Sequence, residues 1–333
     1  MNSSPLVSIL IPSYNAERWL AESIASAVGQ SYPDVEVVVV DDGSTDGSVR
    51  VARSFEGRGV RVFEQANSGA CAARNAALER SGGAYVKFLD ADDVLLPGAV
   101  AAQVAALEGE LEDVASFGMA VRCDAALRPL RGGRPPSVDY EGRLASEDLA
   151  ERLAFLLERN VQTSRPLHRR PLLERVGGFD ARLRAGQEYD LHMRMAVSGV
   201  RFKFVPEVGV LNRDHSGAHR ITNTKKAKSG LGKDWWREVY DLFGGEYPAP
   251  VREARAKALW SGVIRDVIRG NVERARSTAQ EALEMDPALR FNSSRVRSVL
   301  YKLFDPVQTE RAISVSKKYM PNKVARSLKQ LVK

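Results

Sequence analysis

The sequence contains few cysteines and no long apolar run, and both absences limit what the protein can be. Two cysteines, Cys71 and Cys123, among 333 residues exclude a disulfide-stabilised scaffold and suit a reducing compartment. No stretch reaches the roughly 18 to 20 apolar residues that a membrane-spanning helix requires. Residues 1–6 lack the basic and apolar regions of a secretory signal. We therefore expect a protein that is made and kept in the cytoplasm.

Charge is unevenly distributed along the chain. The formal net charge is +7, and from Arg220 to the C-terminus basic residues outnumber acidic residues about two to one. Such a segment is typical of a region that meets an anionic membrane surface, a lipid phosphate or nucleic acid, but a solvated helical surface gives the same composition. No recognisable nucleic-acid-binding module is present, so we expect no nucleic-acid partner.

The first 90 residues alternate between short apolar runs and segments with helical spacing. We expect strands over 7–11, 35–40, 60–64 and 85–89, with helices over 16–29, about 46–55 and 70–80 between them. This rhythm predicts an α/β fold whose mostly parallel sheet carries crossover helices on its faces. Polar clusters follow the strands, at the edge where open α/β sheets bind ligands. The sequence therefore predicts a site at that edge.

The rest of the chain is less regular. Helical patterns are expected over 97–111 and 188–198, with a short strand at 202–205. Beyond residue 225 helical spacing dominates, and two apolar faces predict a pair of helices. A chain of this length exceeds one compact domain, so we predict a first domain over residues 1–224 and a helical, basic C-terminal region over residues 225–333.

Three carboxylates gather directly after the fourth expected strand, in the segment Phe88-Leu89-Asp90-Ala91-Asp92-Asp93. Strand geometry alone would put Asp90 and Asp92 on the same side. Clustered carboxylates repel one another unless a cation neutralises them, and Mg²⁺ or Mn²⁺ accepts such oxygen ligands together with phosphate oxygens. The alternative is an exposed acidic turn that caps the next helix.

The acidic segment has neighbours that make the pattern specific. In order along the chain these are VSILIPSYN (7–15), VVVVDDGS (37–44), Asn-Ser-Gly (67–69) with Ala-Arg-Asn (73–75), and FLDADD (88–93). Together they closely resemble the family 2 glycosyltransferases of the GT-A fold, over roughly residues 5–220. The resemblance implies a Rossmann-like, mostly parallel sheet and an enzyme of the glycosyltransferase class.

The resemblance also implies which residues bind the donor. For the nucleotide sugar these are Pro12, Ser13, Tyr14, Asn15, Asp42, Asn67, Gly69, Arg74, Asn75, Asp90, Ala91 and Asp92. For a divalent cation, Mn²⁺ or Mg²⁺, they are Asp92, Asp93 and His215. His215 lies in a segment similar to an Arg-x-x-His pattern of the family, although here one residue separates it from Arg213. A neutral imidazole can ligate a metal, and a protonated one can pair with phosphate.

The segment Gln187-Glu188-Tyr189-Asp190-Leu191 is similar to the acidic segment that carries the catalytic base in the family. Alignment on Tyr189 puts Glu188 at the position of the base, with Asp190 as the second catalytic candidate. Gln187 stands where an acid is more common. An inverting transfer needs one carboxylate to accept the proton of the acceptor hydroxyl. The alternative role for Glu188 is that of an acid favoured by the dipole at the start of a helix.

These observations favour an inverting, metal-dependent glycosyltransferase that moves a sugar from a UDP- or dTDP-linked donor to a hydroxyl of a glycan or lipid-linked acceptor. A sugar nucleotidyltransferase usually opens with a glycine-rich phosphate loop, where this chain has Pro-Ser-Tyr-Asn (12–15). A non-catalytic sugar-binding relative is the other alternative, and Gln187 is its only support.

The last residues of the chain, 322–333, combine Val324, Leu328 and Leu331 with four basic residues. A basic amphipathic helix of this kind can lie on an anionic membrane, which would make the protein peripheral on the inner face of the plasma membrane. It can equally dock on its own domain or on a second subunit, so an oligomer stays open.

Overall fold

The computed structural model describes residues 4–130, 143–159, 161–184, 186–215, 239–268 and 271–285. The chain divides into two compact units. One contains residues 1–152 and 160–239, and the other contains residues 153–159 together with the chain from Tyr240 onward. The predicted boundary between residues 224 and 225 lies outside the described residues.

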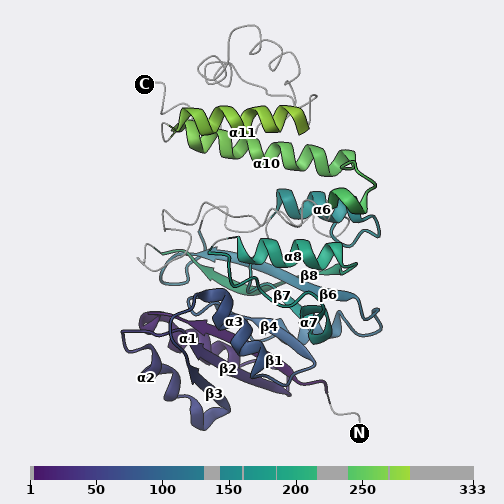
Figure 1. The fold of residues 1–333 in the computed structure, drawn as a ribbon. Coiled ribbons are helices and arrows are strands. Elements are labelled where there is room, and N and C mark those ends of the chain that lie inside the picture. The colour runs from purple at the N-terminus through teal and green to yellow at the C-terminus, as the bar shows by residue number, and fades with distance from the viewer. Residues whose placement is uncertain are drawn as a thin grey trace. The chain divides into compact units, whose positions relative to one another are not determined.

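An eight-stranded sheet, drawn in Figure 1, forms the centre of the first unit, in the order β3-β2-β1-β4-β7-β6-β8-β5. The strands are β1 (Val7–Ser13), β2 (Val35–Asp41), β3 (Val60–Glu64), β4 (Tyr85–Phe88), β5 (Val94–Leu95), β6 (Val114–Cys123), β7 (Pro166–Arg169) and β8 (Arg201–Arg213). The first four strands in space pair in parallel, and so do β6 and β8. β7 is antiparallel to both of its neighbours, and β5 is antiparallel to β8. The predicted α/β class with a mostly parallel sheet is confirmed.

Helices connect the strands of this unit. They are α1 (Glu17–Val28), α2 (Ser48–Arg53), the short 3₁₀ helix η1 (Glu56–Arg58), α3 (Ala70–Glu79), α4 (Ala99–Ala105), α7 (Arg170–Arg175) and α8 (Gln187–Val197). A further helix, α6 (Leu149–Glu158), begins in this unit, and its residues from Leu153 onward belong to the other unit. α3 packs against β1 and β2, and α1 packs against β2 and β5. The β-branched strands and the apolar stripe of α1, Leu20 and Ile24, are fully buried together. Each such side chain contributes roughly 1.5–3 kcal/mol by leaving water, and the result is a rigid support for the loops at the sheet edge.

The sequence predicts the N-terminal half of this sheet well and the other half poorly. The predicted strand at 202–205 is part of β8, which runs from Arg201 to Arg213. The exposed Pro206 and Glu207 break its apolar pattern although its pairing continues. β6, β7 and α6 were not predicted. In β6 nearly every residue is buried, so its sequence lacks the alternation of a half-exposed strand, and its pairing with β8 shifts register near Gly118.

The second unit contains a helical hairpin, α10 (Ala249–Ile268) and α11 (Val272–Met285), as predicted. The two helices pack against each other, and their buried small and apolar side chains include Val251, Trp260, Ala275 and Ala279. Over the described part of the chain, no helix combines the length and the apolar character needed to cross a membrane. The predicted basic helix at 322–333 lies outside the described residues.

Candidate active site

The loops that follow β1 and β2 are tied to each other by side-chain hydrogen bonds. The backbone N–H of Asn15 donates to Ser44 Oγ at 2.9 Å, and the N–H of Thr45 donates to Asn15 Oδ1 at 2.8 Å. Asp41 in turn accepts bonds from the N–H and the hydroxyl of Ser44. Asn15 adopts a positive φ of 47°, which asparagine tolerates better than most residues. Beside this junction the ring of Tyr14 is 42% exposed, so a planar base could stack on it.

Asp42 organises the loop between β3 and α3. Its Oδ1 accepts bonds from Gln65 Nε2 at 2.7 Å and from the N–H of Ser68 at 2.9 Å, and its Oδ2 accepts one from the N–H of Gly69 at 2.8 Å. Gly69 has a φ of 95°, a conformation that favours glycine, and α3 begins directly after it. The predicted nucleotide-binding residues at 42, 67 and 69 therefore lie in one connected structure.

The acidic segment is a tight turn, not an extension of β4. The strand ends at Phe88, and the N–H of Asp93 donates to the carbonyl of Asp90 at 3.0 Å. The expectation that Asp90 and Asp92 share one face of a strand is wrong because the chain reverses between them. As a result Asp90, Asp92 and Asp93 have three different sets of partners.

Asp93 points into the protein interior. Its carboxyl group is 1% exposed and accepts bonds from Ser164 Oγ at 2.8 Å, Asn212 Nδ2 at 3.0 Å and the N–H of Arg213 at 3.1 Å. Burial, together with the charges of Asp92 and Asp90, raises the pKa of Asp93 well above its usual range. These bonds join the acidic turn to the end of β8.

Asp92 points toward His215, and these are two of the three residues predicted to hold a metal ion. Asp92 Oδ2 lies 2.9 Å from His215 Nε2, and the two residues come from segments more than 120 positions apart. The His215 ring lies 5.3 Å from the ring of Trp19 on α1. Among the described residues, no group of three or more His, Cys, Asp and Glu side chains is arranged to hold a metal ion. The protein thus offers an oxygen and a nitrogen ligand here, with any further ligands to come from elsewhere.

Arg74 joins the acidic turn to α8. Its Nη2 pairs with Asp90 Oδ1 at 2.7 Å, and its Nη1 donates to Gln187 Oε1 at 2.6 Å. The guanidinium is 5% exposed and lies 5.1 Å from the centre of the Phe179 ring. Burial alone would lower the pKa of Arg74, but the charge of Asp90 and the hydrogen bond to it raise it above the ordinary value. A buried, charged arginine therefore links two segments about 100 residues apart.

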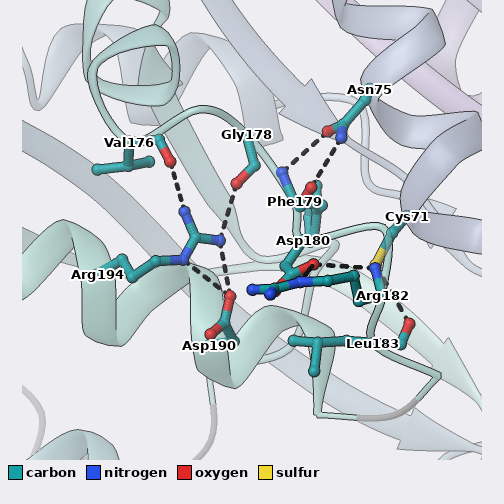
Figure 2. Close-up of polar contacts among 10 residues, drawn as sticks. All are labelled: Cys71, Asn75, Val176, Gly178, Phe179, Asp180, Arg182, Leu183, Asp190 and Arg194. Carbon is teal, nitrogen blue, oxygen red and sulfur yellow. Dashed lines mark hydrogen bonds and ion pairs between the residues drawn. The ribbon is translucent and has the colours of Figure 1, made fainter. Parts of the chain in front are cut away.

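α8 carries both predicted catalytic residues, in different surroundings. Glu188 is half-buried in the first turn, one position after Gln187. Asp190 is 3% exposed, and its Oδ2 accepts bonds from both Nε and Nη2 of Arg194 at 2.9 and 2.7 Å. Arg194 also donates to the carbonyls of Val176 and Gly178, as Figure 2 shows. Asp190 therefore helps to hold the turn that precedes α8.

Asn75 holds the same turn from the side of α3. Its Nδ2 donates to the carbonyl of Phe179 at 2.7 Å, and its Oδ1 accepts the N–H of Phe179 at 2.9 Å (Figure 2). Gly177 and Gly178 have φ values of 71° and 66°, a left-handed conformation that favours glycine. A Cβ on Gly178 would lie 2.7 Å from Asn75 Oδ1, so this position has no room for a side chain.

Comparison with known proteins identifies the family. The model of glycosyl transferase family 2 matches residues 8–172. The uncharacterized glycosyltransferase RP339 of Rickettsia prowazekii is 30% identical over 234 residues, which cover 70% of this chain and 71% of that protein. The chain belongs to glycosyltransferase family 2.

Further relatives of this family 2 glycosyltransferase match shorter parts. TuaG of Bacillus subtilis, named as a proposed glycosyltransferase of teichuronic acid biosynthesis, is 46% identical over 95 residues, or 28% of this chain. That match spans only 38% of TuaG. The succinoglycan biosynthesis protein ExoU of Rhizobium meliloti is 33% identical over 243 residues, which cover 66% of each chain.

Solved structures show that the family 2 glycosyltransferase has the predicted GT-A fold. TarS 1–349 of S. aureus, in complex with UDP-GlcNAc, gives a TM-score of 0.63 at 17% identity, with 98% of this chain and 92% of that chain covered. The mannosyltransferase PcManGT of Pyrobaculum calidifontis, in complex with GDP-Man and Mn²⁺, gives a TM-score of 0.52 at 21% identity, with 94% and 84% covered.

Three side chains that organise the candidate site were not predicted from the sequence. Ser164 and Asn212 bind Asp93, and Arg213 donates from Nε to the carbonyl of Asp92 at 3.0 Å. Arg213 lies two positions before the predicted site residue His215, and this proximity in the sequence was a signal. Ser164 lies in a stretch without a motif, and no sequence feature indicated it.

Proposed function

We propose that this family 2 glycosyltransferase moves a sugar from a UDP- or dTDP-linked donor to a hydroxyl group of a glycan or glycolipid acceptor, with inversion at the anomeric carbon. One observation carries the proposal. The buried Arg74 contacts both Asp90 of the acidic turn and Gln187, the neighbour of Glu188. It therefore brings a candidate diphosphate-binding loop and a candidate base to the same edge of the sheet.

The donor assignment is supported by the loops at this edge and by proteins of the same fold. TarS is described in complex with UDP-GlcNAc, and PcManGT in complex with GDP-Man and Mn²⁺. In this chain the exposed Tyr14 offers a stacking surface for a base, beside the loop that Asp42 holds in place by accepting the N–H of Ser68. A nucleotide-diphosphate sugar presents a planar base that matches this surface.

The residues present fit a divalent cation. The carboxylate oxygen of Asp92 and the imidazole nitrogen of His215 lie 2.9 Å apart, and both are ligands that Mn²⁺ accepts. When bound, Mn²⁺ or Mg²⁺ would stabilise the negative charge that develops on the leaving diphosphate. Asp93, which binds Ser164, Asn212 and Arg213, would hold the turn that presents Asp92.

Glu188 would act as the base. A carboxylate at the start of α8 can accept the proton of the acceptor hydroxyl while its oxygen attacks the anomeric carbon. The turn over residues 176–179 precedes this helix, and Arg194 and Asn75 hold the turn in place by binding its backbone. A single displacement of this kind requires no covalent enzyme intermediate. A glycan acceptor is supported by the relatives TuaG and ExoU, which are named for teichuronic acid and succinoglycan biosynthesis.

Replacement of the proposed base tests this mechanism. In Glu188→Gln the amide cannot accept a proton, so we expect transfer to fall by at least a factor of about 10² while donor affinity stays within about threefold. Transfer would be measured with a panel of nucleotide sugars and acceptors, and donor binding by calorimetry. Glu174→Gln, on the exposed surface of α7, is the matched control. Full turnover in Glu188→Gln would show that the base lies elsewhere.

Metal removal tests the cation site. UDP and dTDP should bind at least about tenfold more tightly in the presence of Mn²⁺ than in the presence of EDTA, because a cation held by Asp92 and His215 would attract the diphosphate oxygens. Asp92→Asn and His215→Ala should each remove most of this difference. Titration calorimetry of the wild-type protein and both variants measures it. Equal nucleotide affinity with and without Mn²⁺ would contradict the assignment.

A further inference from the structure

Gln187 lies between the acidic turn and the proposed base, and its contacts give it a role of its own. We propose that Gln187 is a positioning residue, which uses both ends of its amide to fix the first turn of α8 and thereby the place of Glu188. The inference rests on the proposed function, because it assumes that Glu188 is the base.

The geometry of Gln187 is specific to an amide. Its Oε1 accepts a bond from Arg74 Nη1 at 2.6 Å, and its Nε2 donates to the carbonyl of Leu183 at 3.1 Å. The side chain is 5% exposed, so neither bond is easily replaced by one to water. A carboxylate could accept from Arg74 but would turn an oxygen toward the carbonyl of Leu183, which would then lose its buried donor.

Both partners of the amide are themselves held in place. Arg74 is paired with Asp90, so the position of Gln187 is coupled to the turn proposed to face the diphosphate. The carbonyl of Leu183 also accepts a weak hydrogen bond from Cys71 Sγ at 3.7 Å, as Figure 2 shows. Gly186, which directly precedes Gln187, has a φ of 69° and caps the start of α8. Gln187 thus binds two residues that are themselves held in place, Arg74 and Leu183, at the first turn of α8.

The charge of the site gives a second reason for an amide. Within the described part of the chain Arg74 forms an ion pair with Asp90, and Glu188 is close enough for its charge to act on Arg74. A carboxylate at position 187 would compete with Asp90 for the same guanidinium. The neutral amide binds Arg74 without that competition and leaves the Arg74–Asp90 pair intact.

The test compares variants that remove one or both bonds. Gln187→Met keeps the volume and removes both bonds, and Gln187→Glu keeps the acceptor for Arg74. For Gln187→Met we expect kcat to fall about tenfold or more with the donor KM and Kd within about threefold, and for Gln187→Glu an intermediate kcat. Rates are measured well below the melting temperature of each variant and expressed per folded molecule. Gln280→Glu, on the exposed face of α11, is the control.

Two results would overturn the positioning role. One is a kcat of Gln187→Met within twofold of wild type, and the other is a donor Kd that weakens by the same factor as kcat. Glu188→Gln is assayed beside these variants. An active Glu188→Gln would refute the proposed base, whereas an inactive Glu188→Gln beside a fully active Gln187→Met would refute the role of Gln187 alone.

Discussion

At the scale of single residues, the interior of the glycosyltransferase contains two stacked histidines. The rings of His168 and His192 lie 5.9 Å apart with an interplanar angle of 21°, and both side chains are at most 1% exposed. Burial, with a contribution from the charge of Lys87, lowers the pKa of His168 to about 3. Burial also lowers the pKa of His192 well below its ordinary value. Both rings are therefore neutral in the folded protein near neutral pH.

This pair predicts a loss of stability in acid. Between about pH 6.5 and pH 3 the unfolded chain binds a proton at His168 that the folded protein does not, so the free energy of unfolding falls as pH falls. One such group contributes a slope of up to about 1.4 kcal/mol per pH unit. Urea unfolding between pH 7 and pH 4 would measure it. His168→Phe should flatten the slope, and an unchanged slope would contradict the assignment.

For the acidic turn, the sequence predicts where the carboxylates lie but not which residues they contact. The sequence is sufficient to predict that Asp90, Asp92 and Asp93 lie at the edge of the sheet. It does not predict that one faces Arg74, one faces His215 and one is buried, because the partners come from segments 16 to more than 120 positions away. Such partners depend on tertiary packing, which leaves no periodic signal in the chain.

At the scale of elements, Arg213 joins α1, β8 and the acidic turn. Its guanidinium is 1% exposed, lies 4.3 Å from the Trp19 ring, and pairs with Glu22 at 2.6 Å. It donates to the carbonyls of Asp92 and Ala125 as well. The end of β8 is thereby held beside the start of α1, and His215 follows two positions later.

Loss of this arginine should destabilise the protein. Arg213→Met leaves two backbone carbonyls without their donor, and we expect the free energy of unfolding to fall by about 2–4 kcal/mol. Arg122→Met is the matched control, because its side chain on β6 is 54% exposed and its ion pair with Asp214 should contribute less than about 1 kcal/mol. Chemical denaturation of both variants gives the comparison. Equal effects would contradict the role of Arg213 as an anchor.

Among the elements, the sequence predicts those whose periodicity is clear. In the β1–β4 half, β1 and β2 are rich in β-branched residues and are followed by polar turn residues, so their existence and order follow from the pattern. β6 escapes prediction because burial on both faces removes alternation, and only the first part of β8 is predicted because Pro206 interrupts its apolar pattern. The antiparallel placement of β7 is likewise a tertiary property, since four residues carry little local information.

At the scale of the whole molecule, the chain passes between the two units more than once. Residues 153–159, the end of α6, are grouped with the C-terminal helices, and Glu158 lies 3.3 Å from Lys257 of α10. Several of these residues are apolar and buried, among them Leu153, Phe155 and Leu156. The first unit is thus not a continuous stretch of sequence, which a boundary read from composition does not reveal.

Truncation tests this interdependence. A chain that ends after residue 239 keeps residues 153–159 but lacks α10 and α11, so we expect a lower melting temperature and increased binding of the hydrophobic dye ANS. A chain that ends after Met285 retains both helices and is the matched comparison. Calorimetry and dye fluorescence measure the difference. Equal melting temperatures would show that residues 153–159 are stable without the two helices.

The two cysteines have a practical consequence. Cys71 and Cys123 are at most 2% exposed, and burial raises the pKa of the Cys71 thiol to about 12. Thiol-directed reagents attack accessible thiolates, so neither native cysteine should react quickly with a maleimide. A single cysteine introduced at an exposed position, such as Arg182, would therefore take up a fluorophore selectively. Changes in its emission could report nucleotide binding next to α8 without removal of any native thiol.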